Sequence, residues 1–218
     1  DKLKGTISSV LDQSFTDFEV LVMDDGSTDN TDAVVKSFND LRINYEWYDN
    51  SGGPAAPRNR GIRKAKSEWI CFLDADDAWY RDKLQICYNN IDDTVDLIYH
   101  DLNIQTKTKL NGRNVLRSGL LKSPVLVNLM INGNIISNSS VVVRTNILKQ
   151  VGNINESHVM VAAEDYNTWL KIAEVTEKFL YIPKVLGEYV FSEDAISRKD
   201  MSICGNYAID DFKKHLND

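Results

Sequence analysis

The chain has 218 residues, which is enough for one well-filled α/β domain or for one domain with a small appendage. Its 43% hydrophobic and 26% charged residues are ordinary for a soluble globular protein. The net charge of −7 argues against a nucleic-acid-binding surface, and no apolar run approaches the length of a membrane span.

The first half of the chain alternates predicted helices and strands. Apolar residues at helical spacing predict a helix over residues 3–11 and later helices ending near residues 38, 64 and 91. Strands are predicted over residues 18–23, 43–48, 69–73 and 95–99. The run at 69–73 is unbroken and aromatic-rich, so we expect it to be buried on both faces. This alternation predicts an α/β fold with a largely parallel sheet.

The second half of the chain is less regular. Residues 102–120 are polar and turn-rich, and 192–200 form a charged loop. Helices are predicted over 126–131, 164–173 and 202–216, and strands over 140–144, 179–182 and 185–191. We expect this half to flank the sheet rather than to form an independent domain.

Acidic residues gather where two of the predicted strands end. Asp74, Asp76 and Asp77 follow the strand at 69–73, and Asp24 and Asp25 follow the strand at 18–23. Crowded carboxylates repel one another unless a cation or a donor-rich ligand lies among them. The C-terminal ends of strands are also where open α/β sheets bind ligands. The alternative is a pair of solvated turns, with Ser27 or Thr28 and the acids capping the helices that follow.

A glycine-rich loop with basic residues lies between these two clusters. It begins at Asn50 and runs to Gly61, with Arg58 and Arg60 on the helix that it enters. The loop lacks the Walker A and GxGxxG spacings, so taken by itself it favours a plain surface loop over a phosphate site. Together with the acids it fits a nucleotide diphosphate held with a divalent metal, with Arg58 or Arg60 facing the phosphates.

Five motifs, in this order, resemble those of the family 2 glycosyltransferases, which have the GT-A fold of nucleotide-diphospho-sugar transferases. The motifs are Asp24-Asp25-Gly26-Ser27-Thr28-Asp29, Gly52-Gly53-Pro54 through Arg58-Asn59-x-Gly61, Phe72-Leu73-Asp74-Ala75-Asp76-Asp77, Ser139 to Arg144 before Val151-Gly152, and Glu164-Asp165 before Trp169-Leu170. A single DxD is common by chance, but the ordered set covers nearly the whole chain.

The resemblance implies a role for each matching residue. Asp25 contacts the base of the nucleotide, Asp74 lies near the ribose, Asp76 ligates Mg²⁺ or Mn²⁺, Asp165 is the catalytic base, and Arg58 and Asn59 line the donor pocket. It also implies one domain over 1–218, with a nucleotide-sugar half at 1–101 and an acceptor half at 102–218. For Glu164 and Asp165 the alternative is simple stabilisation of a helix N-terminus.

The implied activity is an inverting, metal-dependent transfer of a sugar from a nucleotide-diphosphate sugar, expected to be a UDP-sugar, to a glycan or lipid-linked glycan. Inversion is one in-line displacement, which needs a base and an electrophile rather than a pair of catalytic carboxyls. Two other interpretations stay open, namely a catalytically impaired nucleotide-sugar-binding remnant or accessory subunit, and a sugar-nucleotide pyrophosphorylase. Cys71, Cys87 and Cys204 are widely spaced and form no CxxC pair, and the first two fall on apolar positions, so we expect those two to be core thiols in a reducing, cytoplasmic compartment. The resemblance leaves open a peripheral association with the inner face of the cytoplasmic membrane.

The chain departs from the family pattern at two places. The first strand of the family is missing, since the first predicted element is a helix. The late Tyr189-Val190-Phe191-Ser192 segment lacks a basic residue at positions 190 and 192, where Arg198 or Lys199 would be the substitute. These departures put donor binding and autonomous stability in question.

Overall fold

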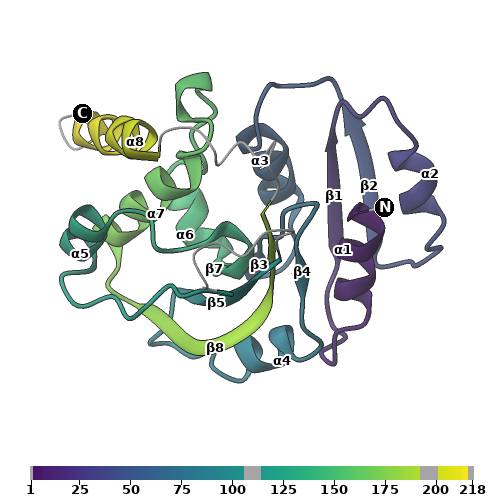
Figure 1. Ribbon diagram of the computed structural model, residues 1–218, viewed down its shortest axis with the longest axis horizontal. Coiled ribbons are helices and arrows are strands. Elements are labelled where there is room, and N and C mark those ends of the chain that lie inside the picture. Colours follow the sequence, from purple (N-terminus) through teal and green to yellow (C-terminus); the bar gives the residue numbers. More distant parts are fainter. Residues whose placement is uncertain (1, 106–113, 192–200, 216–218) are drawn as a thin grey trace.

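The computed structural model describes residues 2–105, 114–191 and 201–215, which form an α/β fold (Figure 1). The helices are α1 (Lys2–Leu11), α2 (Thr31–Lys36), α3 (Ala55–Lys64), α4 (Lys83–Tyr88), α5 (Val125–Asn132), α6 (Thr145–Gln150), α7 (Glu164–Val175) and α8 (Met201–His215). Two short 3-10 helices are η1 (Asn138–Ser140) and η2 (His158–Met160). The strands are β1 (Val20–Asp25), β2 (Ile43–Tyr48), β3 (Trp69–Cys71), β4 (Ala78–Trp79), β5 (Leu97–Gln105), β6 (Val115–Leu116), β7 (Val142–Arg144) and β8 (Phe179–Val190).

The described strands form two sheets. β1 and β2 make a parallel pair of their own, and the second sheet has the order β3-β7-β5-β8-β4, with β6 beside β5. The fold class agrees with the prediction, but the pairing is less parallel than expected. β1–β2 and β5–β8 are parallel, whereas β3–β7, β5–β7, β4–β8 and β5–β6 are antiparallel.

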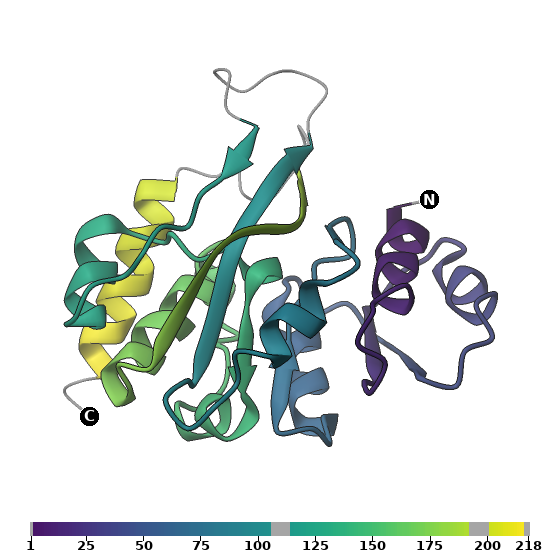
Figure 2. The ribbon, with the colours of Figure 1, turned by 90° about the horizontal axis from the view of Figure 1, so that it is seen from below.

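The two sheets are not hydrogen-bonded to each other within the described residues. β1 pairs with β2, and β3 pairs with β7, which leaves one edge of β1 and one edge of β3 without a neighbouring strand. Both views place α1, α2 and the β1–β2 pair at one end of the molecule and α5, α7 and α8 at the other (Figures 1 and 2).

The second half of the chain supplies part of the sheet, which corrects the expectation that it only flanks it. The predicted strands at 179–182 and 185–191 are one continuous strand, β8, which pairs with β5 along most of its length. The predicted break between residues 182 and 185 is an irregularity in this pairing, where the register shifts between His100 and Asp101 of β5. Part of the segment expected to be polar and turn-rich also joins the sheet as the end of β5 and as β6.

Strand β3 also differs from the prediction. It spans only three residues, and Trp69, Ile70 and Cys71 are half-buried rather than buried on both faces. The reason is its place at the edge of the sheet, where β7 is its one partner among the described strands. Helix α2 begins at Thr31 after Asn30, which makes no side-chain cap, so Ser27 and Thr28 are not its caps.

Helix α7 lies at the centre of the main core and thereby fixes the position of its first turn. Tyr166, Trp169, Leu170 and Ile172 are almost fully buried, and the ring of Trp169 lies 6.3 Å from that of Phe72, the residue after β3. Helices α5 and α8 pack against it. The start of α7 is therefore held rigidly relative to the end of β3.

Three further sequence-based expectations concern cysteines, membrane spans and the late loop. The cysteines are free thiols, with Cys87 and Cys204 buried and Cys71 half-buried. Among the described helices, none combines the length and apolar character needed to cross a bilayer. The predicted substitutes Arg198 and Lys199 lie outside the described residues.

Candidate active site

Arg58, on α3, joins two acidic segments that are far apart in the sequence. Its Nη2 donates to Oδ1 of Asp74 at 2.7 Å, and its Nη1 donates to Oε1 of Glu164 at 2.7 Å. The Arg58 side chain is 15% exposed and that of Glu164 is 6% exposed, so this is a mostly buried charge network. Burial works to lower the pKa of Arg58, but Asp74 and Glu164 outweigh it and raise that pKa. The guanidinium therefore stays charged and ties the end of β3 to the start of α7.

The turn that follows β3 holds its three acids in three different environments. Asp77 is buried, and its carboxylate accepts hydrogen bonds from the Ser139 hydroxyl at 2.6 Å and from the Val190 N–H at 2.8 Å. Burial raises the pKa of Asp77 to about 7, against the effect of these two bonds. Asp74 is 36% exposed and also accepts from the Asn138 amide at 2.9 Å.

Asp76 has fewer partners among the described residues than Asp74 or Asp77, so it is the acid of this turn most available to a ligand. Its side chain is 37% exposed and contacts the Lys2 ammonium at 3.4 Å. No group of three or more His, Cys, Asp or Glu side chains with metal-binding geometry occurs among residues 2–105, 114–191 and 201–215. Mg²⁺ is commonly held by one or two carboxylates together with substrate phosphates and water, and Asp76 fits that arrangement.

Asp25, at the end of β1, lies on the other flank of α3. Its carboxylate pairs with Arg60 Nη1 at 2.9 Å and accepts from the Ser51 N–H at 3.0 Å and the Ser51 hydroxyl. The Arg60 guanidinium stacks over the Tyr48 ring at 4.3 Å. Arg60 thus joins the acid expected at the nucleotide base, rather than the acids after β3.

Asp165 is the second residue of α7 and is half-buried. Its Oδ1 accepts from the Tyr166 N–H at 2.7 Å and from the Asn134 amide at 3.2 Å. Burial, followed by the negative charge of Glu164, raises the pKa of Asp165 to about 7, while Arg58 acts in the opposite direction. A carboxyl group that titrates near neutral pH is suited to accept and release a proton.

Asn59 has a different environment from the one that the motif implied. It is buried, and its amide donates to the Ile154 carbonyl and to Glu156 while its oxygen accepts from the Ile154 N–H. These bonds fasten α3 to the segment before η2. A contact between Asn59 and a donor stays a prediction that these hydrogen bonds do not support.

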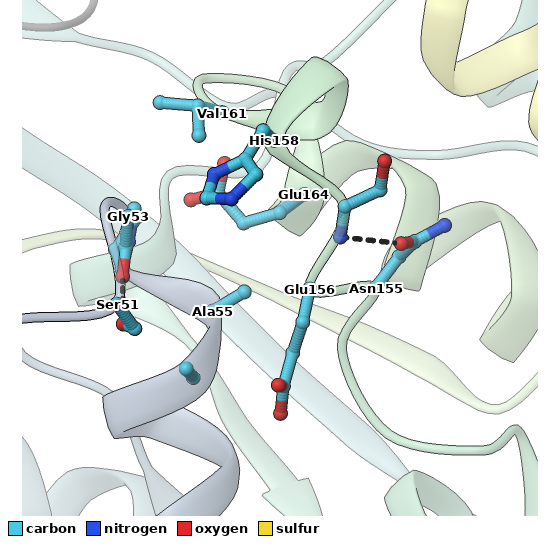
Figure 3. Close-up of a pocket in the computed structure, with 11 residues that line it drawn as sticks. Ser51, Gly53, Ala55, Asn155, Glu156, His158, Val161 and Glu164 are labelled. Atoms are coloured by element: carbon cyan, nitrogen blue, oxygen red, sulfur yellow. Dashed lines mark hydrogen bonds between the residues drawn. The ribbon is translucent and has the colours of Figure 1, made fainter.

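A small pocket lies between the glycine-rich loop and the segment that precedes α7. Figure 3 shows Ser51, Gly53 and Ala55 on one side and Glu156 and His158 on the other, with Glu164 also in the lining. The loop approaches closely, because a Cβ at Gly52 would meet the His158 ring at 3.1 Å and a Cβ at Gly53 would meet Val161 at 2.9 Å. The glycines therefore permit the contact between loop and η2.

Several residues of the site were not singled out by their motifs. Asn138 and Ser139 hold the turn after β3, and Asn134 contacts Asp165. Ser139 opens one of the five motifs, which was the available signal, but nothing in the sequence assigned it to the acids. The buried Oδ1 of Asn138 has no hydrogen-bond partner among the described residues.

The geometry can be compared with known proteins. Residues 1–152 match the profile of the family described as "Glycosyl transferase family 2". The chain belongs to the family 2 glycosyltransferases. The family match covers well over half of the chain and includes the motifs from Asp25 to Arg144.

Relatives of this glycosyltransferase include enzymes of bacterial glycan synthesis. It is 29% identical over 171 residues to the UDP-Glc:alpha-D-GlcNAc-diphosphoundecaprenol beta-1,3-glucosyltransferase WfgD of Escherichia coli, covering 78% of this chain and 64% of WfgD. It is 34% identical over 124 residues to the poly(ribitol-phosphate) beta-N-acetylglucosaminyltransferase TarP of Staphylococcus aureus, covering 55% of this chain and 38% of TarP.

The fold of the chain is that of solved GT-A glycosyltransferases. The crystal structure of TarS from S. aureus matches with a TM-score of 0.70 and 25% identity, over 87% of this chain and 57% of that one. The chain therefore spans less than two thirds of the length of these relatives.

Proposed function

We propose that this chain carries the donor-binding and catalytic residues of an inverting, metal-dependent glycosyltransferase that uses a UDP-sugar. The observation that carries the proposal is the Arg58 bridge, with 2.7 Å contacts to Asp74 and to Glu164. It joins the DxD turn to the start of α7, where Asp165 follows Glu164. One cleft then contains the donor site and the base.

The nucleotide site is built from β1, α3 and the DxD turn. Asp25 accepts hydrogen bonds from the base, and its fixed contacts with Ser51 and Arg60 hold the carboxylate in place. Asp74 lies near the ribose, and Arg58 lines the donor pocket. UDP is favoured as the nucleotide because TarS, which is 25% identical to this chain, has a crystal structure in complex with UDP.

Asp76 is the residue that would hold Mg²⁺ or Mn²⁺ against the diphosphate. The bound cation supplies positive charge that stabilises the leaving diphosphate. Asp76 is suited to this position because its carboxylate is accessible, whereas Asp77 is buried and fully used by Ser139 and Val190. The chain contributes the orientation of Asp76 through the rigid turn.

Asp165 is the base in the transfer step. It takes the proton of an acceptor hydroxyl as the oxygen attacks the anomeric carbon, and the bond from that carbon to the diphosphate oxygen breaks. Because attack comes from the face opposite the leaving group, the configuration inverts. No carboxyl nucleophile is required, which agrees with the assignment of one base.

The acceptor is a glycan or a lipid-linked glycan, and the second half of the chain (102–218) faces it, while 1–101 binds the donor. This acceptor class is supported by the names of two relatives, since WfgD is named for a diphosphoundecaprenol-linked GlcNAc and TarP for poly(ribitol-phosphate). Such acceptors would bring the protein to the inner face of the cytoplasmic membrane, as a cytoplasmic, peripherally associated enzyme.

Calorimetric titration of UDP, with and without Mn²⁺, tests the donor site. We expect affinity to fall at least about tenfold without the cation and in Asp76→Asn. Asp32→Asn is the matched control, because Asp32 is an exposed acid that pairs with Lys36 on α2. A UDP affinity that changes neither on removal of the cation nor in Asp76→Asn would overturn the metal assignment. Absence of UDP binding would overturn the nucleotide assignment.

A second candidate function is a nucleotide-sugar-binding remnant or accessory subunit. The observation that favours it is the separation of the β1–β2 pair from the larger sheet, which leaves Asp25 on a strand with one edge unpaired within the described part of the chain. A panel of nucleotide sugars, assayed for metal-dependent hydrolysis and transfer, separates the two. Metal-dependent UDP binding without turnover of any sugar would favour the remnant.

A further inference from the structure

We propose that Glu164 is a positioning residue that, through Arg58, couples the donor side of the cleft to the orientation of Asp165. This inference rests on the proposed function, since it concerns the same site. It assigns Glu164 a role distinct from both simple helix stabilisation and proton transfer.

Both carboxylate oxygens of Glu164 are engaged, and in different directions. Oε1 accepts from Arg58 Nη1 at 2.7 Å, and Oε2 accepts from the backbone N–H of Ala162 at 2.8 Å. The residue is buried, so neither bond competes with bulk water. Glu164 therefore links a side chain of α3 to the backbone of the turn that precedes α7.

The turn that Glu164 holds is strained. Ala162 has a φ of +79° although it is not glycine, and the Ala163 N–H donates to the Met160 carbonyl at 2.7 Å. With Val161 at φ −56° and ψ 121°, this is a type II turn, in which the third position normally requires glycine. A non-glycine residue in this region costs on the order of 1 kcal/mol or more and persists where its surroundings hold it.

The turn before α7 and the contacts of Glu164 set the orientation of the Asp165 side chain. Ala163, the residue before α7, makes no side-chain cap, so the entry to the helix is set by the turn and by Glu164. The charged groups around Asp165 are Glu164 on α7 and Arg58 from α3, and Asn134 donates to it from the loop after α5. Loss of the Glu164 contacts would release the turn and let the base move.

The link to the donor side runs through the other arm of the same guanidinium. Arg58 Nη2 binds Asp74 Oδ1, which also accepts from Asn138. A single planar guanidinium can hold two carboxylates in fixed directions, which a lysine ammonium on a flexible stem cannot do. A ligand that displaces or reorients Asp74 therefore acts on Glu164, and through it on the turn before Asp165.

Glu164→Gln tests the coupling, because a glutamine at this position can accept only one of the two hydrogen bonds. We expect kcat to fall at least about tenfold at about pH 8, with UDP affinity changed less than about threefold. Ala162→Gly relieves the strain of the turn, so adding it to Glu164→Gln should restore several-fold of the lost rate. A wild-type kcat in Glu164→Gln, or no rescue in the double variant, would overturn the proposal.

Asp96→Asn is the matched control for loss of a half-buried ion pair. Asp96 pairs with Arg144 at 3.2 Å, with side chains 13% and 15% exposed, and the pair lies outside the site. We expect it to lower the melting temperature with kcat unchanged. If Glu164→Gln behaved in the same way, Glu164 would be a structural ion-pair partner and not a positioning residue.

A measurement that needs no turnover separates this inference from the proposed function. Carboxyl-carbon NMR of ligand-free protein should show Asp165 titrating at lower pH in Glu164→Gln, because a neighbouring negative charge is gone. The amide signals of Ala162 and Ala163 should shift as well. If the wild type transfers no sugar, the proposed function fails, whereas unchanged signals in Glu164→Gln overturn the coupling itself.

Discussion

The turn after β3 and the first turn of α7 each bury an acid, but with donors of different charge. Each presents two neighbouring acids, Asp76 with Asp77 and Glu164 with Asp165. In each, one acid is buried and fully bonded by the protein, and its neighbour is left to interact with other groups. Asp77 is held by neutral donors, whereas Glu164 is held by Arg58.

This difference shows why two acids in a motif are not interchangeable. Burial raises the pKa of both Asp77 and Asp165 to about 7, so titration alone does not distinguish a structural carboxyl from a base. The hydrogen bonds do. Asp77 is bonded to Ser139 and Val190 on two separate segments, while Asp165 is bonded mainly within its own turn and to the exposed Asn134.

The largest expected effect separates the two acids of the second turn. Asp165→Asn should lower kcat by about 10²- to 10⁴-fold, because the amide cannot take the proton of the acceptor hydroxyl. UDP affinity should be unchanged, since Asp25 and Asp76 remain. Steady-state kinetics and calorimetry on the same preparation check both statements. Retained transfer in Asp165→Asn would remove the base assignment.

The next largest effect concerns the residue that joins the two turns. Arg58→Met leaves the buried Glu164 without its counter-charge, so we expect the free energy of unfolding to fall by about 3–5 kcal/mol. Urea denaturation followed by circular dichroism measures this loss. The double variant Arg58→Met/Glu164→Gln should recover part of it, because no buried charge is then unpaired. Strict additivity of the two substitutions would contradict the bridge.

The acids of both turns, and Arg58 and Arg60 on α3, could be predicted from the sequence, because their motifs are local. The helices at 3–11 and 164–173 and the strand at 43–48 were also predicted closely, since their apolar periodicity is a property of short segments. The Arg58–Glu164 contact could not be predicted in this way. It joins residues 106 positions apart, and only tertiary packing decides it.

Strand pairing was predicted less well for the same physical reason. The sequence of β8 looks like two strands separated by a break. In the structure it is one strand, because its pairing with β5 continues past a shift in register. That pairing depends on contacts between residues about 80 positions apart. Asn138 and Ser139 are ordinary polar residues in sequence. Their role in holding the acids after β3 becomes visible only when β7 lies beside β3.

The first turn should respond to loss of its buried acid mainly in stability. Asp77→Ala removes the acceptor of the Ser139 hydroxyl and of the Val190 N–H, which leaves one buried and one half-buried donor unsatisfied. We expect the free energy of unfolding to fall by about 2 kcal/mol. Asp76→Ala, in the same turn but with a side chain 37% exposed, should change it by less than about 0.5 kcal/mol. Equal effects at the two positions would contradict the distinction between them.

The pH profile of the wild type tests whether Asp165 acts in its ionised form. Burial, followed by the charge of Glu164, raises the pKa of Asp165 to about 7, so the carboxylate forms as the pH rises through that value. We expect kcat to fall about tenfold between about pH 8 and about pH 6. The acidic limb should be lost in Asp165→Asn. A kcat that is flat across this range would show that the proton acceptor lies elsewhere.

The smallest effect comes from relieving the strain in the turn of residues 160–163, just before α7, while Glu164 is intact. Ala162→Gly removes the Cβ from a residue at φ +79°, but glycine also loses more conformational entropy on folding. The two terms oppose each other, so the free energy of unfolding should rise by no more than about 1 kcal/mol. The informative comparison is with Ala163→Gly, whose φ of −139° needs no glycine and which should therefore destabilise the protein. If both substitutions destabilised it equally, the turn would hold no strain for Glu164 to restrain, and the start of α7 would be as relaxed as the turn after β3.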